Sequence, residues 1–231
     1  MFFDPTYLLF VMLPGMALSL FASWRTKSAF KKYSNVPSST GLTGAQAAQV
    51  MLERAGLHDV QIGRASGFLS DHYNPATRSL ALSESVHDST SIAAIGVATH
   101  EAGHAIQHAR NYAPLWLRSV LVPTANIGSS VGYMVMLFGL ILGVGGMFWI
   151  GVALFSCVLL FQVVTLPVEF DASARAKELV VANGIISRHE REGVDKVLNA
   201  AAMTYVAAAV STLLTLLYFL MRAGVLGGSD D

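Results

Sequence analysis

Four long apolar segments constrain the fold of this chain more than any other feature. They cover residues 1–24, 119–143, 147–166 and 201–222, and each is about the length that an α-helix needs to cross a bilayer. Only 13% of all residues are charged, whereas an ordinary soluble domain has about 25%. We therefore expect a mainly α-helical membrane protein with four transmembrane helices.

The second and third segments are separated only by the glycine-rich stretch 143–146, which predicts a tight helical hairpin. Gly139 and Gly143 are spaced four apart and would give the hairpin one face of small residues for close packing. The first segment is followed, not preceded, by positive charges, which favours an uncleaved anchor over a secretory signal.

The positive charges indicate the orientation in the membrane. All of the 15 lysines and arginines except Arg222 lie in the two polar regions, residues 25–118 and 167–200. The hairpin returns these two regions to one side, and the positive-inside rule places that side in the cytoplasm. We expect the protein in the inner (cytoplasmic) membrane of a cell, in contact with the lipid bilayer. The formal net charge is zero, so no basic field for nucleic acid is present.

The polar regions have short helices and strands. In residues 25–118 we expect helices over 45–55 and 92–110, the second capped by Ser91, short strands near 60–62 and 80–83, and a polar turn over 70–75. In residues 167–200 we expect a helix that opens at Pro167 and a break at Asn183-Gly184.

The second of these helices carries the sequence His100-Glu101-Ala102-Gly103-His104. Two histidines four residues apart lie on one face of a helix, so both imidazoles can bind one metal ion. Glu101 leaves that axis by about 100°, so it cannot easily bind the same ion but can act as a general base toward water. His108 continues the spacing, but it stands about 12 Å along the helix from His100, too far for the same ion.

A catalytic zinc usually has three protein ligands and one open position. Glu169 is the best candidate for the third ligand, because it follows the hairpin on the same side of the membrane. Its alternative role is that of a carboxylate favoured near a helix N-terminus. Ser173, four residues on, shares its helical face and can hydrogen-bond the second nitrogen of one histidine. Asp171 points away from that face in a regular helix, but it is the alternative partner of a histidine if the first turn of the helix is distorted.

Three further residues are candidates for stabilising the oxyanion of a tetrahedral intermediate. His72 and Tyr73 lie in the polar turn before a strand, and Arg175 lies on the Glu169 helix. The alternative for Arg175 is an ordinary solvated charge.

Several stretches together resemble the bacterial family of membrane-bound neutral zinc metallopeptidases. They are residues 2–7, 42–45, 70–75, 82–86, 91–98, 100–107 and 169–173, and they match in order over most of the chain. The plan is more distantly similar to prenyl-protein and heat-shock membrane proteases, which have an aspartate where this chain has Ser173. The resemblance implies a gluzincin-like zinc peptidase unit of α-helices and a small β-sheet on the cytoplasmic side. It also implies that the strand at 80–83 is the edge to which an extended substrate adds.

These observations together predict a membrane-embedded zinc metalloendopeptidase that acts on membrane or membrane-proximal proteins. Zn²⁺ would be held by His100, His104 and Glu169, with Glu101 as the general base. A homo-oligomer or a regulatory membrane partner is compatible with this interpretation. The main alternative is a catalytically silent zinc-binding scaffold or assembly factor. An intramembrane protease with a late aspartate in a span, or a channel, is disfavoured because the apolar segments 120–166 and 201–221 hold no charged residue.

Overall fold

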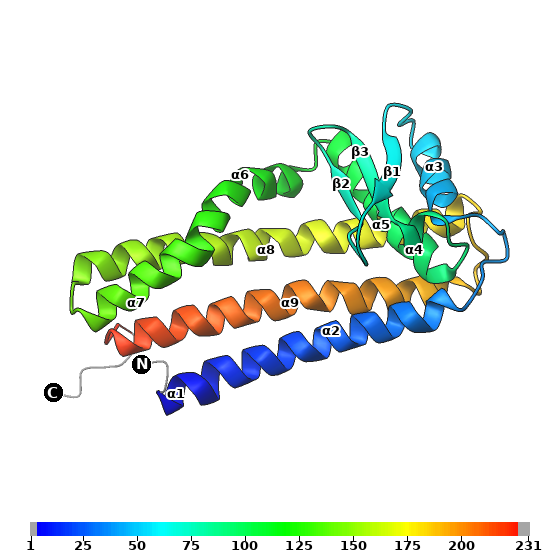
Figure 1. The fold of residues 1–231 in the computed structure, drawn as a ribbon. Helices are drawn as coiled ribbons and strands as arrows, with labels where there is room; N and C mark the ends of the chain where they lie inside the picture. Colours follow the sequence, from blue (N-terminus) through cyan, green and yellow to red (C-terminus); the bar gives the residue numbers. More distant parts are fainter. Residues whose placement is uncertain (1–3, 226–231) are drawn as a thin grey trace. The chain divides into compact units, whose positions relative to one another are not determined.

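The structure, a computed structural model, describes residues 4–225. The elements follow one another as α1 (Pro5–Tyr7), η1 (Leu8–Met12), α2 (Leu13–Ser34), α3 (Gly44–Arg54), β1 (Gln61–Ala65), β2 (His72–Asn74), β3 (Ser79–Ser83), α4 (Glu84–His87), α5 (Ile92–Ala109), α6 (Ala113–Ile127), η2 (Gly128–Gly132), α7 (Tyr133–Ile141), α8 (Gly145–Ala182) and α9 (Arg191–Arg222) (Figure 1). The segments η1 and η2 are single π-helical turns within longer helices. The chain divides into two compact units, described separately below.

Four helical runs among the described residues are long and apolar enough to cross a membrane, as the sequence predicts. They are Pro5–Ser34, Ala113–Ile141, Gly145–Ala182 and Arg191–Arg222. Many large apolar side chains on these runs are exposed, among them Phe10, Trp149 and Ile150. A helix that is apolar on its outer face in this way is suited to lipid rather than to water.

Unit 1 comprises the described parts of Met1–Ala22, Leu117–Leu166 and Thr204–Asp231. The hairpin of α7 and α8 turns at Gly143, whose φ of 68° lies in the left-handed region that glycine tolerates best. A Cβ on Gly139 would lie 2.3 Å from the backbone nitrogen of Phe148, and one on Gly151 would lie 2.2 Å from that of Met136. The predicted hairpin is confirmed, but the packing role predicted for Gly143 is wrong, because this residue forms the turn.

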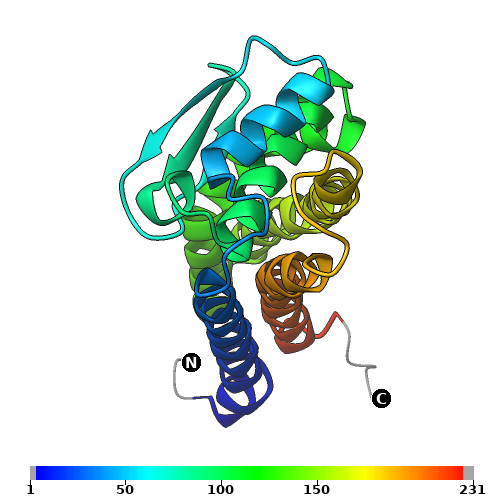
Figure 2. The same ribbon diagram turned by 90° about the vertical axis from the view of Figure 1, so that its right-hand side faces the viewer.

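Unit 2 comprises Ser23–Trp116 and Pro167–Met203. Its core is a cluster of buried apolar side chains from α3, α5, the sheet, α8 and α9, including Met51, Leu82, Ile95, Val180 and Leu198. Thr43 begins α3 with a reciprocal capping box to Gln46, which satisfies two otherwise unpaired backbone N–H groups. The helix α3 packs against α5 (Figure 2).

The three strands form one sheet in the order β1-β3-β2. β1 pairs with β3 in parallel, and β2 pairs with β3 antiparallel. The expectation that the strand at 80–83 is an edge is therefore wrong, because β3 is the central strand. Three short strands with weak alternation carry no information about their order, so the sequence could not distinguish centre from edge. Part of the expected polar turn at 70–75 is the strand β2.

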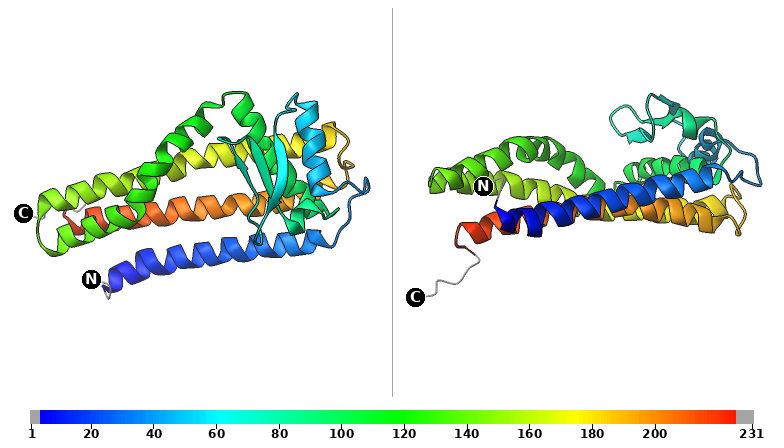
Figure 3. Two further views of the ribbon diagram at one scale, coloured as in Figure 1. Left: turned by 45° about the horizontal axis from the view of Figure 1, so that its top comes forward. Right: turned by 60° about the horizontal axis from the view of Figure 1, so that its bottom comes forward.

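The helix α8 runs without a break through Pro167 (Figure 3). The prediction that a new helix opens at Pro167 is therefore wrong, and Glu169 lies in a helix interior rather than in a first turn. A proline within a helix removes one hydrogen bond and strains the preceding turn, at a cost of about 3 kcal/mol. The apolar run before it and the packing of Val168, Ala172 and Ala176, all fully buried, outweigh that cost.

Candidate metal centre

The helix α5 presents His100 and His104 from a rigid position. Ser91 caps the helix by accepting a hydrogen bond from the backbone N–H of Ala94 at 3.2 Å, as expected. Most of its residues are buried, including Ala98, Ala102 and Ala105, because small side chains let neighbouring elements approach closely. The two imidazole rings lie with their centroids 4.8 Å apart, on one face of the helix.

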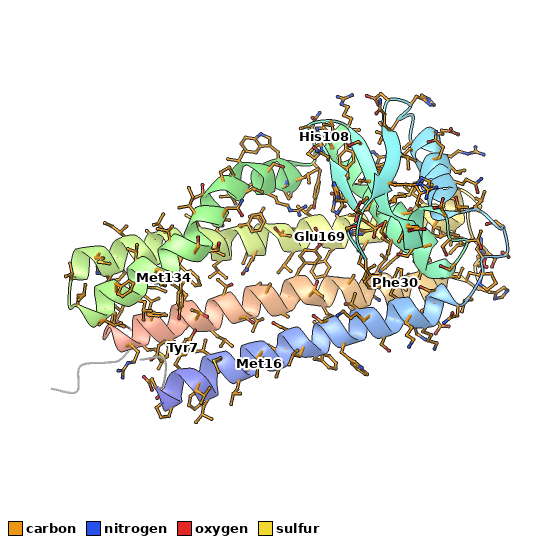
Figure 4. The ribbon with its side chains drawn as sticks, in the orientation of Figure 1. Tyr7, Met16, Phe30, His108, Met134 and Glu169 are labelled. Atoms are coloured by element: carbon orange, nitrogen blue, oxygen red, sulfur yellow. The ribbon has the colours of Figure 1, made fainter. Side chains whose placement is uncertain are left out.

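The helix α8 supplies the third candidate ligand, the carboxylate of Glu169 (Figure 4). Its Oε2 lies 3.2 Å from Nε2 of His100 and 3.6 Å from Nε2 of His104. Glu169 is 2% exposed, so this carboxylate is almost entirely removed from water. The structure thus brings together the three residues that the sequence predicts as ligands, with one ligand atom from each within 4.8 Å of the others.

The two spacings from the Glu169 oxygen are close to those between zinc ligands. Tetrahedral ligands at about 2.0–2.1 Å from zinc lie roughly 3.3–3.4 Å from one another. The two measured distances from the Glu169 oxygen, 3.2 and 3.6 Å, bracket that value. When both rings carry their proton on Nδ1, the lone pairs on Nε2 face a carboxylate oxygen. That arrangement of acceptors is repulsive unless a cation lies among them, so the donor set suits a metal ion.

Both Nδ1 atoms have partners that are compatible with this state. Ser173 Oγ lies 3.2 Å from Nδ1 of His100, and Gln107 Oε1 lies 3.0 Å from Nδ1 of His104. Asp171 contacts neither histidine. Its Oδ2 instead accepts a hydrogen bond from Gln107 Nε2 at 2.7 Å. The sequence anticipates Ser173 and Asp171 as neighbours of the ligands, but it assigns no role to Gln107.

Gln107 and Gly103 are two residues of the site to which the sequence analysis assigns no role. Gln107 lies seven residues after His100, on the same face of α5, so a polar side chain there is directed to the buried side. A Cβ on Gly103 would lie 2.8 Å from the carbonyl oxygen of Ala172, so only glycine allows this approach of α5 and α8. Neither contact could be identified without the packing of the two helices.

The charges around the cluster favour cations. Burial by itself lowers the pKa of His104, but its hydrogen bond to Glu169 and the charge of Glu101 raise it above its ordinary value. Protons and a metal ion therefore compete for this histidine. Glu101 is 9% exposed. Its charge acts on a second carboxyl group, that of Asp71. Burial raises the pKa of Asp71, hydrogen bonds from Ser83 lower it, and the nearby charge of Glu101 adds to the rise, so the net pKa lies above its ordinary value.

The three residues predicted to stabilise an oxyanion lie in different surroundings. Tyr73 on β2 forms a hydrogen bond of 2.9 Å between its hydroxyl and Nδ1 of His108, one turn beyond His104 on α5. His72 is exposed, and its Nδ1 contacts the carbonyl oxygen of Ser70 at 2.9 Å. Arg175 pairs with Asp171, with Nε 2.6 Å from Oδ2. None of these contacts involves His100, His104 or Glu169, and the role of the three residues toward an oxyanion stays a prediction.

Comparison with known proteins agrees with this geometry. Residues 8–224 match a family described as "Putative neutral zinc metallopeptidase". The chain is 46% identical over 223 residues to a Bacillus subtilis (strain 168) protein named "Putative membrane protease YugP", covering 96% of this chain and 98% of that protein. No solved structure matches. Since the family match covers almost the whole chain, this protein belongs to the neutral zinc metallopeptidase family.

Proposed function

We propose that this protein is an integral membrane zinc endopeptidase whose site faces the cytoplasm. The observation that carries the proposal is the convergence of His100, His104 and Glu169 at zinc-ligand spacing, directly beside Glu101 on α5. Bound zinc would supply a Lewis acid that polarises a peptide carbonyl and makes water more acidic. The protein's own side chains perform the remaining steps.

Glu101 acts as the general base and acid. Its carboxylate takes a proton from the attacking water and later delivers that proton to the leaving amine. Its low exposure supports this role, because neighbouring groups hold a buried side chain in a fixed position beside the ligands. His100, His104 and Glu169 hold the ion, and Ser173 and Gln107 hold the rings.

The substrate would be an extended segment of a membrane or membrane-proximal protein. Main-chain pairing to a sheet edge is the general way to bind such a segment. Since β3 is central, the edge available beside α5 is β2, which pairs with β3 along one side and contacts α5. The Tyr73–His108 hydrogen bond ties β2 to the helix that carries the metal ligands.

The cytoplasmic orientation rests on the distribution of lysine and arginine. Unit 2 contains most of these residues, including Lys31, Lys32 and Arg175, whereas the described part of unit 1 contains only Arg118 and Arg222. By the positive-inside rule, unit 2 lies in the cytoplasm and the inner membrane holds the apolar helices.

The test is cleavage of an unfolded protein by the purified full chain in detergent or nanodiscs, loaded with zinc. Glu101→Gln removes the base and keeps the ligands, so it should bind zinc as the wild type does and lose activity by about 10³-fold. Glu178→Gln, at an exposed position on α8, is the matched control and should behave as wild type.

Two outcomes would contradict the proposal. Full cleavage by Glu101→Gln would remove that residue as the base. A wild-type protein that binds one zinc ion but cleaves no substrate, including membrane proteins from the same cells, would favour the alternative of a zinc-binding scaffold.

A further inference from the structure

Gln107 is a polar side chain with no exposed surface. It lies three residues after His104 on α5 and uses both ends of its amide. Nε2 donates to the carbonyl oxygen of Val168 at 2.8 Å and to Oδ2 of Asp171 at 2.7 Å, and Oε1 lies 3.0 Å from Nδ1 of His104. A buried amide must form such bonds, because an unpaired one costs about 1–3 kcal/mol.

The two partners of Nε2 settle which way the amide points. A backbone carbonyl and a carboxylate can only accept hydrogen bonds, so the amide end that faces them must be the NH₂ group. The carbonyl oxygen Oε1 therefore faces His104, and Nδ1 of that ring must carry the hydrogen. In the neutral ring, Nε2 is then unprotonated and directed toward Glu169 Oε2, 3.6 Å away. This is the tautomer that can bind a metal ion.

Asp171 holds the amide from the other side. Its carboxylate accepts a hydrogen bond from Gln107 Nε2 and pairs with the guanidinium of Arg175. Nε of Arg175 lies 2.6 Å from Oδ2 of Asp171, and Nη2 lies 3.2 Å from Oδ1. The Arg175 guanidinium also lies 5.9 Å from the centre of the Tyr112 ring. Three side chains thus extend in sequence from His104: a neutral amide, a carboxylate and a guanidinium.

We propose that Gln107 is a positioning residue that fixes the tautomer and orientation of His104, and that Asp171 acts on His104 only through Gln107. The proposal deepens the proposed function and rests on the zinc site described there. It also gives Arg175 a structural role, as the partner that holds the Asp171 carboxylate in place. Residues that hold a metal-binding histidine in this way typically change metal affinity by about 10–100-fold when they are removed.

The first experiment measures the zinc dissociation constant of the full-length protein by competition with a chelator. Gln107→Met keeps the length and volume of the side chain and removes all three hydrogen bonds, so it should weaken zinc binding by about 10–100-fold. Gln107→Glu keeps an oxygen beside Nδ1 of His104 but turns a second oxygen, in place of the amide NH₂ group, toward the acceptors Val168 and Asp171. It should therefore not restore wild-type zinc affinity. Gln49→Leu, at an exposed position on α3, is the control and should leave the constant unchanged.

The second experiment tests the order of the three side chains with a double-mutant cycle. Asp171→Leu should weaken zinc binding, and the double variant Gln107→Met/Asp171→Leu should be no weaker than Gln107→Met alone, because Asp171 acts through the amide. A purely structural role of the pair would lower the unfolding midpoint of the metal-free variants and leave zinc affinity within about threefold of wild type.

The outcomes separate the two proposals. If the wild type binds no zinc, the proposed function fails. If the wild type binds zinc and Gln107→Met binds it equally well, or if the two substitutions are additive, the positioning role is overturned while the zinc site stands. If Gln107→Met does not fold, the zinc affinity of Asp171→Leu tests the positioning role by itself. Unchanged zinc affinity in that variant would also overturn the proposal.

Discussion

Gly103 is a point of close approach between the two ligand-bearing helices. It lies on α5 between the two histidines, opposite Ala172, which lies on α8 between Glu169 and Ser173. A Cβ at Gly103 would lie 2.8 Å from the Ala172 carbonyl oxygen, whereas ordinary contact begins at 3.4 Å, so the helices must separate locally by roughly 0.6 Å. The obstacle is backbone, which cannot rotate away as a flexible side chain can.

The substitution Gly103→Ala therefore acts on the metal ligands without replacing any of them. The distances from Glu169 Oε2 to the two Nε2 atoms, now 3.2 and 3.6 Å, would lengthen by up to the same amount. Functional constellations tolerate only about 0.5 Å of displacement. We expect zinc affinity to fall at least about tenfold, which corresponds to about 1.4 kcal/mol. Overpacking should cost about 1–3 kcal/mol of stability, partly offset by about 1 kcal/mol of helix propensity.

The measurement is zinc affinity by chelator competition, together with the unfolding midpoint of the metal-free protein. Gly96→Ala is a matched control on the same helix, because its Cβ would meet Val194 Cγ1 at 3.5 Å, an ordinary contact. That variant should bind zinc as wild type and be as stable or slightly more so. A folded Gly103→Ala protein with wild-type zinc affinity would refute the claim that this contact sets the ligand positions.

Three further predictions concern pH, the hairpin and the metal. Burial raises the pKa of Glu190, but hydrogen bonds from Ser187 and Ser39 outweigh it and lower the pKa below its ordinary value. The stability that this carboxylate contributes is thus present above its unfolded pKa, about 4.3, and is lost as pH falls through the folded pKa. Glu190→Gln should lower the unfolding free energy by about 1 kcal/mol at neutral pH, with the difference from wild type shrinking below about pH 4; a constant difference would contradict this. Gly151→Leu should disrupt the hairpin and lower the unfolding midpoint. Gly146→Leu is the control, because nothing lies within 4 Å of the added Cβ. Equal unfolding midpoints for the two variants would contradict the close packing of α7 and α8 at Gly151. Chelation should abolish cleavage and destabilise the wild type by about 3 kcal/mol if zinc is present at 100 times its dissociation constant, but should not destabilise Glu169→Gln.

The sequence predicts the helices of this protein well, for physical reasons that are local. A run of about 20 apolar residues is long enough to cross a bilayer as a helix, and the helix over 92–110 has a cap at Ser91 and a continuous buried face. The structure has that helix as Ile92–Ala109. The zinc motif could likewise be placed on it, since a spacing of four residues is meaningful only on a helix.

What the sequence could not predict depends on contacts between distant elements. Pro167 is a local signal for a helix start, and only the packing of its neighbours shows that α8 continues through it. The central place of β3 follows from pairing with both β1 and β2, which no single strand encodes. Gln107 meets Asp171 only because α8 presents that residue to α5, 64 positions along the chain.

The charge of the buried site explains why the two histidines have neutral partners, Ser173 and Gln107. Two carboxylates, Glu169 and Glu101, lie on or beside the ligand set, and the two positive charges of a bound Zn²⁺ would balance them. Asp171 adds nothing to this balance, because Arg175 compensates it. An aspartate in place of Ser173 would leave one uncompensated negative charge in a site whose residues are almost fully buried, and isolated buried charge is costly. Ser173 and Gln107 can hold the rings without that cost. Asp171 bonds to Gln107 instead of to a histidine, and at that place Arg175 pairs with its carboxylate.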